Sequence, residues 1–259
     1  MAALLTVITV TRRPQYLPAC CETIDRQGEA VPLQHLILGD GVGRLERPSG
    51  SRHRDILVLC PRSPTECDGP SRLGALRNLA VQLAATDDIV FLDDDNRWEP
   101  DHLASLFATR AATNASFVHS ERALFEPDGR PYLREEFPWA RDPAARRQIW
   151  ERYRCLGIVT PGSNIWRDRL PMPHSCVDLG AWVLPRRFLL AHPFQTVYTE
   201  ADWEANITED HGLATAILAS RLPVASTGRP TLLYWLGGYS NHFDPAAPIR
   251  WQPPHAASR

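Results

Sequence analysis

Residues 89–100 read IVFLDDDNRWEP, and this stretch constrains the fold more than any other in the chain. Four apolar residues, Ile89–Leu92, run directly into three carboxylates, which we call the acidic cluster: Asp93, Asp94 and Asp95. A carboxylate withdrawn from water is costly unless its charge is compensated, and neighbouring like charges add to that cost. The stretch therefore predicts a buried strand that ends in the acidic cluster, with a cation as the compensating group.

Strand-like and helix-like segments alternate through the first half of the chain. Strands are predicted at 4–10, 33–38, 55–59 and 88–92, and helices at 16–26, 71–84 and 100–110. The apolar residues of 71–84 recur at helical spacing behind Ser71, which is expected to be the N-cap. Such alternation predicts an α/β domain with a mostly parallel, Rossmann-like sheet flanked by helices. Ligands bind beyond the carboxyl ends of such strands, which is where the acidic cluster falls.

The second half is less regular, and a smaller mixed part is expected there. A hairpin is predicted from 116–125 and 130–133 around the turn PDG, with helices at 144–154 and 210–220 and strands at 177–184 and 231–235. A length of 259 residues suits one continuous domain.

Composition and charge exclude several classes of protein. The net charge of −2 implies no general attraction to nucleic acid. No apolar run approaches the roughly 20 residues of a membrane span, so no integral membrane segment is expected. The six cysteines show no metal-binding spacing and are expected to be thiols in a cytoplasmic protein.

The acidic cluster has the residue types of a divalent metal site. Alternate strand residues point to the same face, so Asp93 and Asp95 can share one side. Two carboxylates on one side suit a hard cation such as Mg²⁺ or Mn²⁺, which keeps open positions for substrate phosphates. The plainer alternative is a solvated acidic turn that caps the helix beginning near Pro100.

The stretch IVFLDDDNRWEPDHL resembles the DXD segment of family 2 glycosyltransferases, which have the glycosyltransferase A-type (GT-A) fold. Four other pieces resemble further family motifs in the right order: LLTVITVTRRPQYL the opening strand and loop, LILGDGVG the second-strand motif, SRLGALRNLAVQLAATDD the arginine-bearing helix, and NITEDHGLA the late acidic motif. The second-strand motif departs from the family pattern, because Gly39 replaces its first acid.

The resemblance implies a metal-dependent, inverting transfer of a sugar from a nucleotide donor, typically UDP-linked. The donor is expected to contact Thr9, Thr11, Asp40, Arg77, Asp93, Asp94 and Asp178. Mn²⁺ or Mg²⁺ is expected on Asp95 and Asp93, with His242 as a further ligand. Asp210 is expected to be the general base that deprotonates the acceptor hydroxyl, and Glu209 is the competing candidate.

The resemblance also implies that two parts of the chain bind different substrates. Residues 1–112 would form the nucleotide-binding half, and residues 113–259 the acceptor-binding half with the C-terminal tail. The expected partners are a nucleotide-sugar donor, a saccharide, natural-product or lipid-linked acceptor, and a second copy of the chain in a homodimer. Trp203 is a candidate to stack on an acceptor sugar, although packing in the core or a loop is the favoured explanation.

Each proposed role has a plainer alternative. Asp40 precedes a glycine, as in many simple turns, and Arg77 could lie on a helix surface. Glu209 and Asp210 begin a predicted helix, where acidic residues are favoured by the helix dipole anyway. A lone histidine such as His242 is more often a hydrogen-bonding residue than a ligand, and His119 and His211 are weaker metal candidates still.

Other functions remain open from the sequence. A sugar nucleotidyltransferase can share the fold and metal acids, but it usually has a glycine-rich loop where this chain reads VTRRPQYL. The segment GDGVG does not match the GxGxxG pattern of a dinucleotide site. A non-catalytic protein that binds nucleotide-sugars would need no base, so the role of Asp210 separates it from an enzyme.

Overall fold

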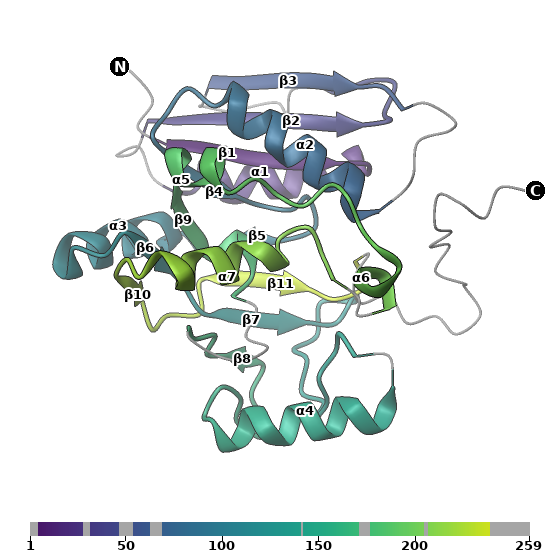
Figure 1. The fold of residues 1–259 in the computed structure, drawn as a ribbon, viewed down its shortest axis with the longest axis vertical. Coiled ribbons are helices and arrows are strands. Elements are labelled where there is room, and N and C mark those ends of the chain that lie inside the picture. The colour runs from purple at the N-terminus through teal and green to yellow at the C-terminus, as the bar shows by residue number, and fades with distance from the viewer. Residues whose placement is uncertain are drawn as a thin grey trace, which may run out of the picture.

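The computed structural model describes residues 5–27, 32–46, 54–62, 69–140, 142–170, 177–204 and 207–238 (Figure 1). Its strands are β1 (Leu5–Thr11), β2 (Leu33–Asp40), β3 (Arg54–Cys60), β4 (Asp88–Phe91), β5 (Arg97–Trp98), β6 (Phe117–His119), β7 (Arg122–Phe125), β8 (Ile165–Trp166), β9 (Trp182–Pro185), β10 (Val224–Ser226) and β11 (Leu232–Trp235). Its helices are η1 (Pro14–Tyr16), α1 (Leu17–Asp25), α2 (Pro70–Leu83), α3 (His102–Thr113), α4 (Pro143–Cys155), η2 (Leu179–Ala181), α5 (Arg186–Ala191), α6 (Glu200–Glu204) and α7 (His211–Ser220).

The main sheet has seven strands in the order β10-β6-β9-β4-β1-β2-β3. β4, β1, β2 and β3 run parallel, and β9 is antiparallel to both β4 and β6. Every side chain of β2 is buried, as expected for a strand covered on both faces. Figure 1 shows α1 and α2 on opposite faces of these parallel strands. The mostly parallel, helix-flanked sheet predicted from the sequence is therefore confirmed.

A second sheet of four strands, in the order β5-β11-β7-β8, lies beside the first. β5 belongs to the first half of the chain, but it pairs with β11 near the end of the described residues, with Trp98 opposite Leu232. An aromatic cluster that includes Trp150, Trp166 and Tyr234 packs this sheet against α4. The second sheet thus joins segments that are distant in sequence.

The hairpin predicted from 116–125 and 130–133 forms only close to its turn, and most of 116–125 pairs elsewhere. β6 pairs with β9 and β10 in the main sheet, whereas β7 pairs with β8 and β11 in the second sheet. The PDG turn does form, with Gly129 at a φ of 88°. Next to it, the Glu126 amide donates to the Arg130 carbonyl at 2.8 Å, the Tyr132 amide donates to the Leu124 carbonyl at 3.0 Å, and Phe125 and Pro131 form an antiparallel bridge.

Two element boundaries also differ from the prediction. α2 begins at Pro70 behind Gly69, so Ser71 lies inside the helix and does not cap it. Residues 177–184 do not form one strand, because η2 precedes β9. Among the described helices, none is long and apolar enough to cross a membrane.

Candidate active site

The acidic cluster lies directly after β4, at the carboxyl edge of the parallel strands. β1 is the neighbouring strand, and its last residue, Thr11, donates a hydrogen bond of 2.6 Å to Asp94 Oδ2. Arg13, two residues further on, donates from Nη2 to Asp94 Oδ1 and to Asp95 Oδ2, each at 2.6 Å. Asp94 is consequently only 4% exposed and held by both groups. The loop after β1 therefore supplies positive charge to two of the three carboxylates.

Arg77 supplies the positive charge for the third carboxylate of the cluster. It is a buried side chain of α2, and its Nη2 donates to Asp93 Oδ1 at 2.8 Å. Its Nη1 forms an ion pair with Glu209 Oε1, which comes from the segment before α7. The Asp93 side chain remains 43% exposed, whereas that of Glu209 is almost fully buried. Arginine side chains thus contact all three carboxylates of the cluster.

Burial makes several of these carboxylates unusually basic. Desolvation raises the pKa of Asp95 to about 6, and repulsion from Asp93 adds to the shift, while Arg13 opposes it. Desolvation likewise raises the pKa of Glu209 to about 7, against the attraction of Arg77. A second positive charge near Asp95 would favour its ionised form.

Asp40 stands at the end of β2 among three arginines. Arg72 Nε donates to its Oδ1 at 3.0 Å, Arg62 Nε lies 3.3 Å from the same oxygen, and Arg12 Nε lies 3.8 Å from Oδ2. Gly41 follows with a φ of +68°, and a Cβ there would come within 2.5 Å of Arg62 Cδ. The positive φ therefore favours glycine at this turn, directly after the carboxylate at which the three arginines meet.

Thr9 and Asp178, the other residues predicted to contact the nucleotide-sugar donor, differ in their surroundings. The Thr9 hydroxyl is fully buried and hydrogen-bonds His35 Nε2 at 3.0 Å, so it is already engaged within the core. Asp178 accepts a 2.8 Å bond from the Gly180 amide and lies 3.6 Å from Arg122 Nη1. Burial raises the pKa of Asp178 to about 6, with repulsion from Asp93 among the causes, so Asp178 lies near the cluster.

Asp210 lies at the N-terminus of α7, half-buried. Its Oδ1 accepts a 2.6 Å hydrogen bond from the Thr208 hydroxyl, and its charge helps to raise the pKa values of Glu209 and Asp178. Asp210 therefore faces the same region as the acidic cluster. Unlike Glu209, it forms no ion pair with an arginine among the residues that the structure describes.

The histidine and tryptophan candidates are not brought to this site by the described residues. His242 lies outside the described residues, as does the side chain of Trp203. His211 is exposed at the start of α7. His119 is buried against Trp182, with ring centroids 4.8 Å apart.

The carboxylates of Asp93 and Asp95 fit a divalent cation that takes its other ligands from phosphate and water. Within the described ranges, no group of three or more His, Cys, Asp and Glu side chains is arranged to hold a metal ion. Mg²⁺ commonly binds through only one or two carboxylates and takes its other ligands from phosphates and water. Asp95 is 18% exposed, and its pKa is raised by a neighbouring carboxylate, which an added cation would offset. The residues fit a cation that arrives with a phosphate-bearing ligand.

Sequence reasoning missed the four arginines that pair with the acids: Arg12, Arg13, Arg62 and Arg72. The signal for two of them was the TRRP segment after the first strand, which placed basic residues at the carboxyl edge of the sheet. Arg62 and Arg72 carried no such signal, because only the folded chain brings them to Asp40.

The fold and this edge of the sheet define a protein of the GT-A type. The model of the family described as glycosyl transferase family 2 matches residues 66–169, which include α2 and the acidic cluster. The fold also resembles crystal structures of S. aureus TarS. The unliganded 1-349 fragment aligns at 10% identity with a TM-score of 0.53, and the alignment covers 92% of this chain and 61% of that one.

The same fragment in complex with UDP aligns at 13% identity with a TM-score of 0.54, covering 92% of this chain and 62% of that one. The complex of this fragment with UDP-GlcNAc aligns at 11% identity with a TM-score of 0.53, and the alignment covers 90% of this chain and 58% of that one. The chain thus spans about three fifths of the TarS fragment. No curated protein matches the sequence. Residues 66–169 therefore match the family model that the motifs predicted, and the fold resembles that of TarS.

Proposed function

We propose that this protein is a metal-dependent glycosyltransferase that moves a sugar from a nucleoside-diphosphate donor to an acceptor hydroxyl. The observation that carries the proposal is the meeting of the acidic cluster, the arginine-surrounded Asp40 and Asp210 at one edge of the sheet in a family 2 chain. A nucleotide-sugar needs positive charge for its phosphates and a carboxylate for the acceptor. Both are present at this edge.

UDP is the favoured nucleotide. The support comes from TarS, a protein of similar fold whose crystal structures include complexes with UDP and UDP-GlcNAc. In this chain, Asp40 would accept hydrogen bonds from the base, and the arginines around it would lie close to the donor. Guanidinium groups are well suited to hydrogen-bond phosphate, and three of them meet at this carboxylate.

Asp95, assisted by Asp93, would hold Mn²⁺ or Mg²⁺. The chemistry that such a cation supplies is neutralisation of the charge that develops on the departing diphosphate. Arg13 and Arg77 already hold these two carboxylates in place. The chain's own contribution is therefore a preorganised pair of oxygens at the edge of the sheet.

Asp210 is a better general base than Glu209. The Glu209 carboxylate is buried and paired with Arg77, so it would have to break that ion pair before accepting a proton. Asp210 is more accessible, and Thr208 orients its carboxylate. Glu209 would then be a positioning residue that fixes Arg77 and, through Arg77, Asp93. Deprotonation of the acceptor by Asp210 in a single displacement would invert the anomeric centre.

A nucleotide panel tests the proposal. UDP, ADP, GDP, UDP-glucose and UDP-GlcNAc would each be added with and without Mn²⁺, and the melting temperature of the protein would be measured. We expect the largest stabilisation from one UDP-sugar in the presence of Mn²⁺. A ligand at 100 times its Kd stabilises by about 2.7 kcal/mol, which is a readily measured shift.

Matched variants separate binding from chemistry. Asp95→Asn should remove most of the Mn²⁺-dependent shift. Asp210→Asn should keep that shift but lower the rate of UDP release in the presence of an acceptor panel by at least about 100-fold. If no nucleotide stabilises the wild type, the proposed donor is wrong. If Asp210→Asn turns over normally, the base is another residue, with Glu209 tested next.

A further inference from the structure

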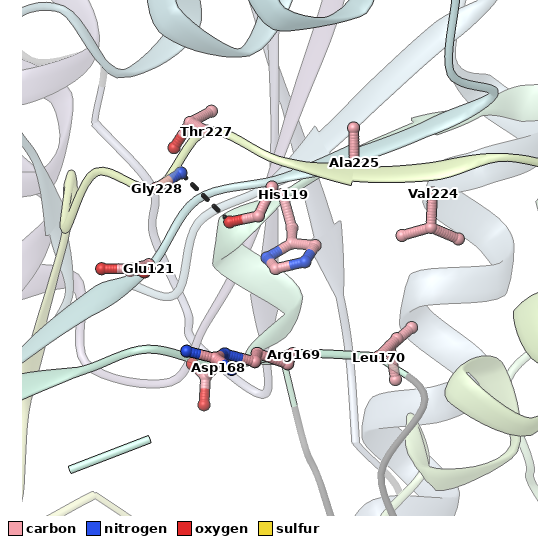
Figure 2. A pocket seen from close by; sticks show the side chains of 10 residues that line it. His119, Glu121, Asp168, Arg169, Leu170, Val224, Ala225, Thr227 and Gly228 are labelled. Carbon is pink, nitrogen blue, oxygen red and sulfur yellow. Dashed lines mark hydrogen bonds between the residues drawn. The ribbon is translucent and has the colours of Figure 1, made fainter. Parts of the chain in front are cut away.

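A pocket of about 350 Å³ lies at the far end of the second sheet from the acidic cluster (Figure 2). Three segments line it: the end of β6, the residues after β8, and β10 with the turn that follows. Glu121 of the lining directly precedes β7, and Gly228 precedes β11. By contrast, Gly238 follows β11, and a Cβ on it would lie 3.2 Å from Asp95 Oδ2. The pocket is therefore separate from the candidate active site.

His119 presents a hydrogen-bond acceptor to this pocket. Its Nδ1 lies 3.0 Å from the Ser120 carbonyl oxygen, which can only accept, so Nδ1 carries the ring proton. Burial lowers the pKa of His119 to about 4, which keeps the ring neutral and leaves Nε2 with a lone pair. Figure 2 shows the ring directed into the pocket. No hydrogen bond to Nε2 is made by any described residue.

Glu121 adds a second acceptor. Its side chain is 9% exposed, and within the described part of the chain it forms no hydrogen bond or ion pair. Burial raises the pKa of its carboxyl, while the charges of Arg167 and Arg169 lower it. A buried carboxylate normally has hydrogen-bond donors, so this one is suited to donors supplied by a ligand.

The rest of the lining mixes apolar and cationic groups. Leu170, Val224 and Ala225 form an apolar side, and the exposed Arg169 adds a cationic group to the lining. Acceptors, donors and an apolar surface within one small pocket match a ligand that carries several hydroxyl groups on an apolar ring. A saccharide has this chemistry, and the volume lies at the lower end of the range for ligand pockets, about 300–1,000 Å³.

A buried arginine connects the pocket with the acids of the active site. Asp168 lines the pocket and pairs with Arg122, with Nε and Oδ2 2.9 Å apart. The same Arg122 lies 3.6 Å from Asp178, whose pKa responds to Asp93 and Asp210. One arginine side chain therefore joins the wall of the pocket to Asp178.

We infer that this pocket is a second binding site, for a neutral saccharide whose hydroxyls donate to His119 Nε2 and the Glu121 carboxylate. The ligand could be a distant sugar of the acceptor or a free saccharide that modulates transfer. Both sources share the same hydroxyl chemistry. The inference concerns binding and does not depend on the proposed transfer.

Binding of glucose, N-acetylglucosamine, lactose and maltose would be measured by ligand-observed NMR and calorimetry, on the wild type and on variants. We expect at least one of them to bind with a Kd that saturating UDP leaves unchanged. Glu121→Gln and His119→Phe each remove an acceptor and should weaken binding about 10-fold, the effect of one lost hydrogen bond to a buried polar group. Asp128→Asn, an exposed carboxylate beyond β7, is the matched control and should bind normally.

Asp210→Asn should also bind the saccharide normally, which separates the pocket from the active site. If no saccharide of the panel binds, or if UDP displaces it, or if Asp210→Asn loses binding while Glu121→Gln keeps it, the inference is wrong. Transfer assays then identify the source. Competition with the acceptor indicates part of the acceptor, and a changed rate without competition indicates a separate effector; either result supports the pocket.

Discussion

Two buried arginines in this protein each lie between two carboxylates, but their surroundings differ. Arg77 pairs with Glu209 and with Asp93, and Asp93 is 43% exposed at the edge of the main sheet. Arg122 pairs with Asp168 and approaches Asp178, and Trp139, Trp166 and Tyr234 surround its guanidinium group at 4.5, 5.9 and 5.7 Å.

The difference separates a charge arrangement that can change from one that is fixed. Water and ligands reach Asp93, so the positive charge that neutralises it can come from Arg77 or from another cation. The Asp168–Arg122 pair is enclosed by aromatic rings, and an ion of this kind cannot be lost without leaving its partner buried and unpaired. We interpret the first arrangement as functional and the second as a rigid link between the two sheets.

The largest expected effect comes from removing the enclosed arginine. Arg122→Met should lower the free energy of unfolding by about 3–5 kcal/mol, because it leaves Asp168 buried without its counter-ion. Urea unfolding measures this change. Arg77→Met is the matched variant, and we expect it to cost less because Asp93 is partly solvated. If both variants lost the same free energy of unfolding, the distinction between the partly exposed Arg77–Asp93 pair and the enclosed Arg122–Asp168 pair would be wrong.

The next largest effect is a dependence of the free energy of unfolding on pH, caused by Asp168. Burial raises the pKa of Asp168 to about 7, from an ordinary value of 3.8. Between these values the folded state binds more protons than the unfolded state, so stability should fall as pH rises from about 4 to 7. Asp168→Asn removes this titration and should reduce the slope by up to about 1.4 kcal/mol per pH unit.

Urea unfolding at pH 5, 6, 7 and 8 measures both slopes. Asp95, Asp178 and Glu209 also have raised pKa values and act in the same direction, so part of the wild-type slope should remain in the variant. A wild type that becomes more stable between pH 5 and 7 would show that these carboxyls are better compensated than the geometry indicates.

The smallest effect on stability is expected for the partly exposed pair of Arg77 and Asp93. Asp93→Asn should change the free energy of unfolding by less than about 1 kcal/mol, because the side chain is partly solvated and removing its charge also relieves repulsion of Asp95. The same variant should weaken Mn²⁺-dependent binding of UDP, measured by calorimetry. A large loss of stability with unchanged UDP binding would assign Asp93 a structural role.

Much of the first half of the fold could be predicted because its signals are local. The apolar run Ile89–Leu92 predicted a buried strand, and the spacing of 71–84 predicted a helix, which the structure places within one or two residues. The hairpin prediction held only for the residues next to the turn, because it used only local information. The partners of β6 and β7 lie in β9, β10, β8 and β11, far along the chain.

The sequence alone determined the parallel α/β architecture and the position of the acidic cluster at a strand end, because both follow from the order of apolar and charged residues along the chain. Only the tertiary structure decided which charges meet. Arg77 reaches Glu209 across 132 residues, and Arg13 reaches Asp95 across 82. Such pairs depend on sheet order and burial, since the free energy of a buried charge is set by its neighbours in space.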